Sequence, residues 1–283
     1  MGTLAALKYH AAFIRDHPAL VEWWLKNRIR AVSLRYERRQ PDGISRFPRG
    51  ITIKPTLACN LRCKMCGFVT SGHVFDDPKD SLPLETWKSL IDDIAPHEPY
   101  VTLTGGEPLL YPQISELITY IKQRGMILTV TTNASMLSKR APEFIENAPD
   151  ALVVSLDGPN HVHNDVRGAA RSFEMAAEGI RTVQALRKER RQKNPLLVIN
   201  CSVTAYNYRH IEEMLDIAHE IGVDAINYQH QWALTHKMVE AHHRWYADPH
   251  LWVWRRPAAC AWLNTDILPN GDVEPCPGMV CGN

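Results

Sequence analysis

Three cysteines, Cys59, Cys63 and Cys66, lie close together in the sequence, at spacings of four and then three positions. Thiolates on one short loop suit an iron–sulfur cluster, but a [4Fe–4S] cluster has four irons and is commonly held by four cysteines. A loop with three cysteines therefore predicts either a fourth ligand from elsewhere or an iron left open for chemistry. A zinc site is the alternative, but zinc takes four ligands and no neighbouring residue supplies the fourth.

Polar or glycine residues follow the second, third and fourth predicted strands. They are the run Gly105-Gly106-Glu107, then Asn133, then Asp157. Glycines allow a backbone to approach a ligand closely, and Pro108 stiffens the exit of their turn. Each group also has a purely structural explanation: a tight turn, a capped strand end, or a Gly-Pro turn.

From Gly50 onward the hydrophobic pattern alternates between strands and helices. It predicts strands at 51–54, 100–103, 127–132, 151–156, 196–204 and 225–230, and helices at 84–94, 114–124, after an N-cap at Ser172, and at 211–221. Six such βα units predict an α/β fold, with a parallel sheet curled into a full or partial barrel. Ligands bind at the carboxyl ends of such strands, where every candidate group lies.

These motifs, in this order over about residues 48–230, resemble the radical S-adenosylmethionine (SAM) superfamily. The resemblance implies a partial (β/α)6 barrel with an N-terminal helical segment. It also implies a [4Fe–4S] cluster held by the three cysteines, with SAM on the fourth iron. An electron from the reduced cluster would cleave SAM to methionine and a 5′-deoxyadenosyl radical, which abstracts a substrate hydrogen.

The resemblance implies roles for single residues. Gly105, Gly106 and Glu107 would bind the methionyl amino group, with Asn133 and Ser155 near the ribose and methionine, Met65 near the adenine, and Asp157 in the same SAM site. The run 155–168 is similar to the sulfatase-maturing branch and implies Arg167 as the partner of the methionyl carboxylate, which suits the fixed fork of arginine donors. His161 and His163 have no ligand spacing, so we expect solvated loop histidines.

A second cysteine group, Cys260, Cys276 and Cys281, surrounds a hairpin signal at 269–272. It resembles the start of the SPASM or twitch extension and implies a probable second iron–sulfur cluster. A zinc knuckle is the alternative. The full extension has further cysteines, so we expect a truncated chain. Cys201, on a predicted strand, is expected to be a core residue rather than a ligand.

The chain divides into three predicted parts: a helical segment at 1–47, the barrel at 48–232, and a linker with the small cysteine extension at 233–283. An apolar stripe in the first part predicts a face that packs on the barrel; its residues are Leu20, Val21, Trp24, Leu25 and Ile29. The aromatic segment 229–254 is expected to line the substrate opening.

The 283 residues have 45% hydrophobic content and a formal net charge of +1, which gives no argument for a nucleic-acid partner. No stretch approaches the roughly 18 apolar residues of a membrane span, and the N-terminus lacks a signal-peptide pattern. We therefore expect a cytoplasmic protein with no membrane span. Seven cysteines in a reducing compartment favour metal ligation over disulfides, and six of them lie in the two groups described above.

The leading hypothesis is a radical SAM enzyme that modifies a peptide or protein. The alternative is an enzyme of small-molecule biosynthesis that makes a cofactor, sugar or lipid. A third hypothesis, from another class, is a non-catalytic iron–sulfur or zinc protein. The enzyme hypotheses imply a reductant protein such as flavodoxin or ferredoxin as a partner.

Overall fold

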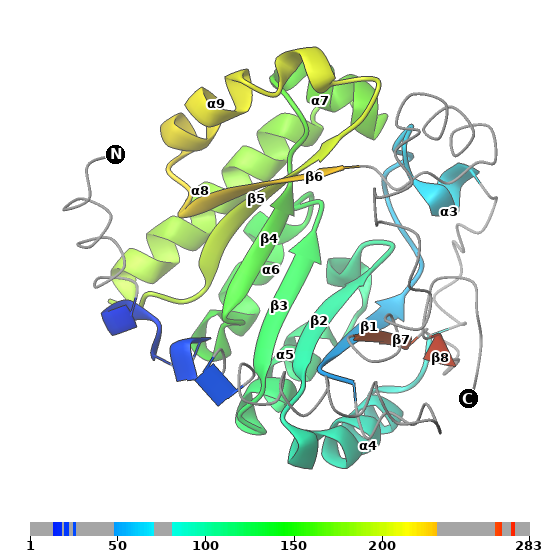
Figure 1. The fold of residues 1–283 in the computed structure, drawn as a ribbon, viewed down its shortest axis with the longest axis vertical. Helices are drawn as coiled ribbons and strands as arrows, with labels where there is room; N and C mark the ends of the chain where they lie inside the picture. Colours follow the sequence, from blue (N-terminus) through cyan, green and yellow to red (C-terminus); the bar gives the residue numbers. More distant parts are fainter. Residues whose placement is uncertain are drawn as a thin grey trace, which may run out of the picture.

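The computed structural model describes residues 14–18, 20–22, 25–26, 48–70, 81–230, 264–267 and 273–274. These residues contain one sheet in the order β6-β5-β4-β3-β2-β1-β7-β8 (Figure 1). Its strands are β1 (Gly50–Thr56), β2 (Tyr100–Gly105), β3 (Ile127–Thr132), β4 (Ala151–Ser155), β5 (Leu196–Val203), β6 (Ala225–His230), β7 (Asn264–Ile267) and β8 (Val273–Glu274). Strands β1 to β6 pair in parallel and do not close on themselves, which confirms the α/β fold with a partial barrel.

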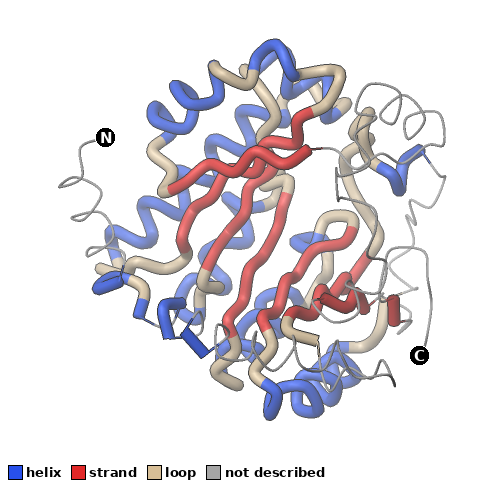
Figure 2. The backbone as a smooth tube through the Cα atoms, in the orientation of Figure 1, coloured by secondary structure: helices blue, strands red, loops and turns tan. Residues whose placement is uncertain are grey.

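Helices cover one face of this sheet, as Figures 1 and 2 show. They are α4 (Leu84–Ile94), α5 (Ile114–Gln123), α6 (Leu137–Phe144), α8 (Ser172–Glu189) and α9 (Glu213–Ile221). Each presents an apolar stripe to the strands; in α4, Leu84, Trp87, Ile91 and Ile94 are buried at helical spacing. The layers form one apolar core between the helices and the sheet.

Alternate strand residues face this core, because successive side chains in a strand point to opposite faces. Val101 and Leu103 of β2 are fully buried in the core, and so are Leu152 and Val154 of β4. The other face, here called the inner face, has apolar residues such as Val153 and Val198 together with many residues that have hydroxyl or amide groups. They include Thr102, Thr104, Thr129, Thr131, Ser155, Asn200, Ser202, Asn227 and Gln229.

Two local expectations about helices are wrong. Ser172 is the first residue of α8 rather than its N-cap, which is Arg171; the Ser172 hydroxyl donates to Asn164 Oδ1 at 2.8 Å and to the Ala169 carbonyl. Residues expected to form a loop instead form α7 (Asn160–Arg167), which ends at Gly168 in the left-handed conformation. This helix contributes directly to the candidate site.

The predicted C-terminal hairpin strands are present. Strands β7 and β8 pair in antiparallel fashion, with Ile267 opposite Val273. Strand β7 also pairs in parallel with β1, with Asn264 opposite Gly50 and Ile267 opposite Ile53. The hairpin therefore extends the sheet beyond β1, a long-range pairing that the sequence pattern did not predict.

The described parts of the N-terminal segment lie against loops at the amino ends of the strands. His17 Nδ1 is 3.2 Å from Asn194 Oδ1, and Lys26 Nζ is 3.5 Å from Glu98 Oε1. Within the predicted apolar stripe, Leu20 and Val21 are half-buried, but Leu25 is 53% exposed and does not pack on the barrel. None of the helices in the described ranges is long and apolar enough to cross a bilayer.

Candidate functional site

The predicted site residues at the ends of β1 to β4 contact one another. Asn133, which follows β3, places Nδ2 3.9 Å from Cys59 Sγ and 3.1 Å from Asn60 Oδ1. Arg167, at the end of α7, places Nη1 3.7 Å from Cys63 Sγ. Two of the three cysteine sulfurs therefore face side-chain N–H groups, one from the residue after β3 and one from the end of α7.

The cysteine loop runs from the end of β1 to the short helix α3 (Gly67–Thr70). None of its three cysteines forms a disulfide; Cys63 is buried, and Cys59 and Cys66 are half-buried. Burial raises the pKa of the Cys59 thiol, a rise that the Leu61 N–H opposes. Burial also raises the pKa of the Cys63 thiol, and Arg167 opposes that rise. Nearby donors therefore support the charged forms of the Cys59 and Cys63 thiols against the effect of burial.

Gly105 and Gly106 allow the chain leading into the cysteine loop to pass directly over the end of β2. A Cβ on Gly105 would lie 2.3 Å from the Thr56 carbonyl oxygen, and one on Gly106 would lie 2.3 Å from the carbonyl oxygens of Leu57 and Ala58. Gly105 also has φ +122°, which favours glycine. These glycines accommodate the backbone of the loop itself, whether or not they also contact a ligand.

Glu107 is fully buried, and its carboxylate bonds within the protein. Oε1 accepts from the Thr132 hydroxyl at 2.7 Å and from the Leu109 N–H at 3.1 Å, and Oε2 accepts from the Asn133 N–H at 2.7 Å. Burial raises its pKa to about 7, against the effect of these hydrogen bonds. The side chain therefore ties the end of β2 to the end of β3.

Asp157 and Arg167 form a buried ion pair beside Cys63. Arg167 Nε lies 2.7 Å from Asp157 Oδ2, with side-chain exposures of 10% and 0%. Burial opposes the positive charge, but Asp157 and Cys63 more than offset it, so the pKa of Arg167 lies above its usual value. Its planar fork has five N–H donors, more than these two contacts engage.

The remaining predicted SAM residues lie at the same edge of the sheet. Ser155 is the last residue of β4, half-buried and paired in register with Asn200. Met65 is half-buried in the turn before Cys66. Their roles toward SAM stay predictions.

His163 is not the solvated loop histidine that we expected. It is 1% exposed within α7, and its Nδ1 accepts a hydrogen bond from the Asp157 N–H at 3.1 Å. Burial, with a smaller contribution from Arg167, holds the pKa of His163 well below its usual value. His161 is exposed, as expected, with its ring edge-on to His210.

Asn207 supports the site and was not predicted. It is fully buried, and its Nδ2 donates to the Asp157 carbonyl at 2.7 Å and to the Ser202 carbonyl at 2.9 Å. The position follows β5, as the other site residues follow their strands, and that placement was the available signal. Cys201 is a buried core residue, as expected, and burial raises its pKa to about 12.

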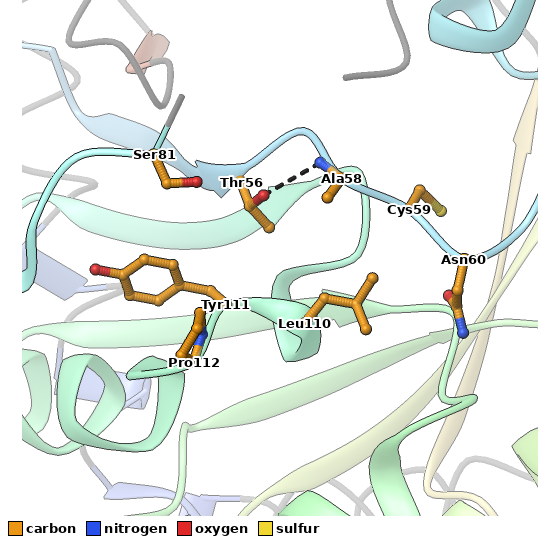
Figure 3. A pocket seen from close by; sticks show the side chains of 8 residues that line it. All are labelled: Thr56, Ala58, Cys59, Asn60, Ser81, Leu110, Tyr111 and Pro112. Carbon is orange, nitrogen blue, oxygen red and sulfur yellow. Dashed lines mark hydrogen bonds between the residues drawn. The ribbon is translucent and has the colours of Figure 1, made fainter. Parts of the chain in front are cut away.

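A pocket of about 290 Å³ lies beside Cys59 (Figure 3). Thr56, Ala58, Cys59 and Asn60 line it on the cysteine-loop side, and Leu110, Tyr111 and Pro112 line it on the side that follows β2. Figure 3 shows Asn60 and Cys59 at one end and the Tyr111 ring at the other. The pocket therefore gives open space next to one of the three thiols.

Residues 53–218 match the family model of the radical SAM superfamily, and this match covers more than half of the chain. The chain belongs to the radical SAM superfamily. Membership implies a [4Fe–4S] cluster and SAM, and it identifies the chain as that of an enzyme.

Curated relatives within this superfamily differ in what their names describe. An AdoMet-dependent heme synthase of Methanosarcina barkeri is 31% identical over 63% of this chain and 49% of that protein. The antilisterial bacteriocin subtilosin biosynthesis protein AlbA of Bacillus subtilis is 24% identical over 83% of this chain and 56% of that protein. The chain spans about half the length of these relatives.

Among solved structures, the fold is similar to Streptococcus suis SuiB bound to its precursor peptide SuiA. The TM-score is 0.61 at 18% identity, over 87% of this chain and 63% of that chain. At this identity the likeness shows the shared fold.

The residues of the radical SAM site suit an iron–sulfur cluster. Three cysteines lie on one loop, which agrees with thiolate ligation of such a cluster. The N–H groups of Asn133 and Arg167 and the charge of Arg167 suit an anionic cluster.

The predicted second cluster lies elsewhere in the chain. Cys260, Cys276 and Cys281 fall outside the described residues, and the radical SAM family match ends before them. The SPASM or twitch extension and its cluster therefore stay predictions, as does a zinc knuckle.

Proposed function

We propose that this protein reductively cleaves SAM and uses the resulting radical to modify a peptide or protein. The observation that carries the proposal is the set of three cysteines, none of them in a disulfide, on the loop after β1, with donors from Asn133 and Arg167 facing two of their sulfurs. When bound, the cluster and SAM supply a 5′-deoxyadenosyl radical for hydrogen abstraction. Cys59, Cys63 and Cys66 hold the cluster in this proposal.

The chain's own residues bind and orient SAM in the proposal. Backbone groups at Gly105 and Gly106, with Glu107 holding the turn, bind the methionyl amino group. Further donors of the Arg167 fork, which Asp157 holds in place, bind the carboxylate. Asn133 and Ser155 face the ribose and methionine, and Met65 lies by the adenine.

The inner face supports a peptide substrate. Asn227 Nδ2 donates to Asn200 Oδ1 at 2.7 Å, and Asn200 Nδ2 donates to Gln229 Oε1 at 3.2 Å, which gives a row of amide groups beside the threonines of β2 and β3. A peptide backbone offers donors and acceptors to such a wall at every residue. A broad apolar ring would desolvate the donors and acceptors that these amides do not use on one another, at about 1–3 kcal/mol for each group left without a partner.

The small-molecule alternative keeps one specific observation in its favour, the similarity to a heme synthase over 63% of the chain. A tetrapyrrole carries several carboxylates, which call for several cations. Among strands β1 to β6, the inner face has one charged side chain, Lys54, which is 6% exposed and lies 5.8 Å from the Phe68 ring centre. This charge pattern supports a peptide over a polycarboxylate.

We further propose an auxiliary iron–sulfur cluster at Cys260, Cys276 and Cys281, and electron delivery by flavodoxin or ferredoxin in the cytoplasm. The hairpin of β7 and β8 supports the first of these, because an extension of this kind begins with a hairpin. The family's need for a reductant supports the second.

The enzyme proposal is tested by anaerobic reconstitution with iron and sulfide, followed by dithionite and SAM. We expect 5′-deoxyadenosine from the wild type and none from Cys63→Ala. A wild type that is fully loaded with iron and forms no product would overturn the proposal.

The substrate class is tested by adding soluble extract of the source cells, with its peptides and proteins retained, before and after protease treatment. We expect the untreated extract to stimulate 5′-deoxyadenosine formation and protease to abolish the stimulation. Stimulation that survives protease would favour the small-molecule alternative.

A further inference from the structure

Arg167 occupies a position between a carboxylate and a cluster-binding sulfur. Its Nε faces Asp157 Oδ2 at 2.7 Å, and its Nη1 faces Cys63 Sγ at 3.7 Å. All three groups are buried, so water screens their interactions little. The charge of Arg167 therefore acts on Cys63, and the charge of Asp157 partly neutralises it.

Asp157 is itself held from three directions. Its Oδ1 accepts from the Ser202 N–H at 3.0 Å, its carbonyl accepts from Asn207, and its N–H donates to His163 Nδ1. These partners come from α7, from β5 and from the turn after β5. The carboxylate is thus fixed before any ligand binds, and it fixes the guanidinium in turn.

The end of α7 also clamps the cysteine loop directly. The Lys64 N–H donates to the Val166 carbonyl at 2.9 Å, and Lys64 Nζ pairs with Asp165 at 2.6 Å. Gly168 has φ +68°, and a Cβ there would lie 2.8 Å from the Arg62 carbonyl oxygen. The distance between Arg167 and Cys63 is therefore set by backbone contacts on both sides.

We propose that Asp157 and Arg167 are positioning residues that set the reduction potential of the cluster through Cys63. This inference rests on the proposed function only in placing a cluster at Cys63. Reduction adds negative charge to the cluster, and N–H donors and positive charge near its sulfurs stabilise the reduced form. Arg167 raises the potential, and Asp157 limits that rise.

The two residues therefore have opposite predicted effects. Removing the Arg167 charge takes a donor and a cation from Cys63, so the potential falls. Removing the Asp157 charge leaves the Arg167 cation uncompensated, so the potential rises. A purely structural ion pair predicts something different, because loss of either partner would disturb the loop in the same way.

The test is an EPR-monitored redox titration of the reconstituted [4Fe–4S] cluster without SAM. It compares the wild type with Arg167→Gln and Asp157→Asn, and uses Asp165→Asn as the matched control. Asp165 also pairs α7 with the cysteine loop, through Lys64, but its side chain is 63% exposed. Solvent therefore screens its charge far more than it screens the charges of the buried pair. We expect a lower midpoint for Arg167→Gln, a higher one for Asp157→Asn, and no change for Asp165→Asn.

Shifts of the same sign for both buried variants, or no shift in either, would overturn the inference. If Arg167→Gln fails to retain its cluster, Arg167→Lys keeps the charge while losing the fork. Because lysine keeps the cation and loses the Nη1 contact to Cys63, a midpoint at or below that of the wild type supports the inference, and a higher midpoint overturns it. Because SAM is absent, the shifts are measurable in an enzyme that makes no product. A wild type that binds no cluster would overturn this inference and the proposed function together.

Discussion

The Glu107 carboxylate accepts a hydrogen bond from the Asn133 N–H at 2.7 Å, and this contact joins the ends of β2 and β3. Asn133 in turn directs its side-chain amide to Asn60 and Cys59. A buried acid on one strand end thereby positions a polar group beside a cluster-binding sulfur. Glu107 is 0% exposed, so its side chain supports the site from inside the protein.

Replacing Glu107 with glutamine should remove a pH dependence of stability. Burial raises the pKa of Glu107 from 4.5 to about 7. Between pH 4.5 and 7, folding of the chain takes up a proton at Glu107. The free energy of unfolding therefore falls as pH rises through this range, and it levels off above pH 7. The full loss is about 3 kcal/mol, at about 1.4 kcal/mol per pKa unit.

In Glu107→Gln we expect stability relative to the wild type to improve by roughly that amount between pH 4.5 and 7. Denaturant unfolding under anaerobic conditions measures it at each pH. The amide also points a donor at the Asn133 N–H, so the variant has a constant penalty that does not depend on pH. A difference that stays flat across the window would contradict the raised pKa.

Gly106→Ala should displace the cysteine loop. The new Cβ would lie 2.3 Å from two carbonyl oxygens of residues 57 and 58, and backbone cannot yield as a flexible side chain does. We expect loss of bound iron and destabilisation of about 3 kcal/mol or more, as for other overpacked sites. Iron analysis after reconstitution and thermal unfolding measure the two effects.

Gly125→Ala is the control for that substitution. Gly125, unlike Gly106, has a positive φ, +73°, but nothing lies within 4 Å of an added Cβ. We expect a cost of about 1 kcal/mol from backbone strain and full iron loading. Equal iron loading in both variants would show that the close approach at Gly106 is dispensable.

The fold was predictable because strands with apolar residues on their helix-covered face alternate along the chain with amphipathic helices. The strand ends then place Cys59, Glu107, Asn133 and Asp157 at one edge. Helix α7 was missed because its buried face includes His163 and Arg167, which are typical of solvent-exposed positions. Gly168, whose left-handed conformation ends the helix, was the available signal. The pairing of β7 with β1 joins residues more than 200 positions apart, which local patterns do not encode.

His163→Asn should change stability at acid pH. The neutral imidazole accepts from the Asp157 N–H, and burial lowers its pKa well below 6.5. Below pH 6.5 the unfolded chain binds a proton that the folded protein does not, so stability falls as pH falls, by about 1.4 kcal/mol per pH unit. The Asn variant keeps an acceptor without titrating, so we expect the wild type to lose stability relative to it below pH 6.5. Denaturant unfolding of both proteins at pH 5 to 7.5 measures this. If their free energies of unfolding changed in parallel with pH, His163 would take up its proton in the folded protein as it does in the unfolded chain.

Cys63→Ala and Cys201→Ala should separate a cluster ligand from a core cysteine. Cys201 is 0% exposed and lies in the core, where Asn207 Nδ2 is 3.8 Å from its sulfur. Its truncation should cost about 1 kcal/mol of stability and leave iron and sulfide content unchanged. Cys63 faces Arg167 on the cysteine loop, so its truncation should remove the cluster and all 5′-deoxyadenosine formation.

Iron that remains in Cys63→Ala would then belong to the proposed auxiliary cluster, and a further Cys276→Ala substitution should remove it. Loss of all iron in Cys63→Ala alone would mean that the chain has one cluster site. Loss of iron in Cys201→Ala would make Cys201 a ligand. We do not expect this result, because Cys201 lies on the helix-covered face of β5, whereas the cysteine loop lies at the carboxyl edge of the sheet. Iron and sulfide analysis of the three variants thus assigns each thiol from its own loss.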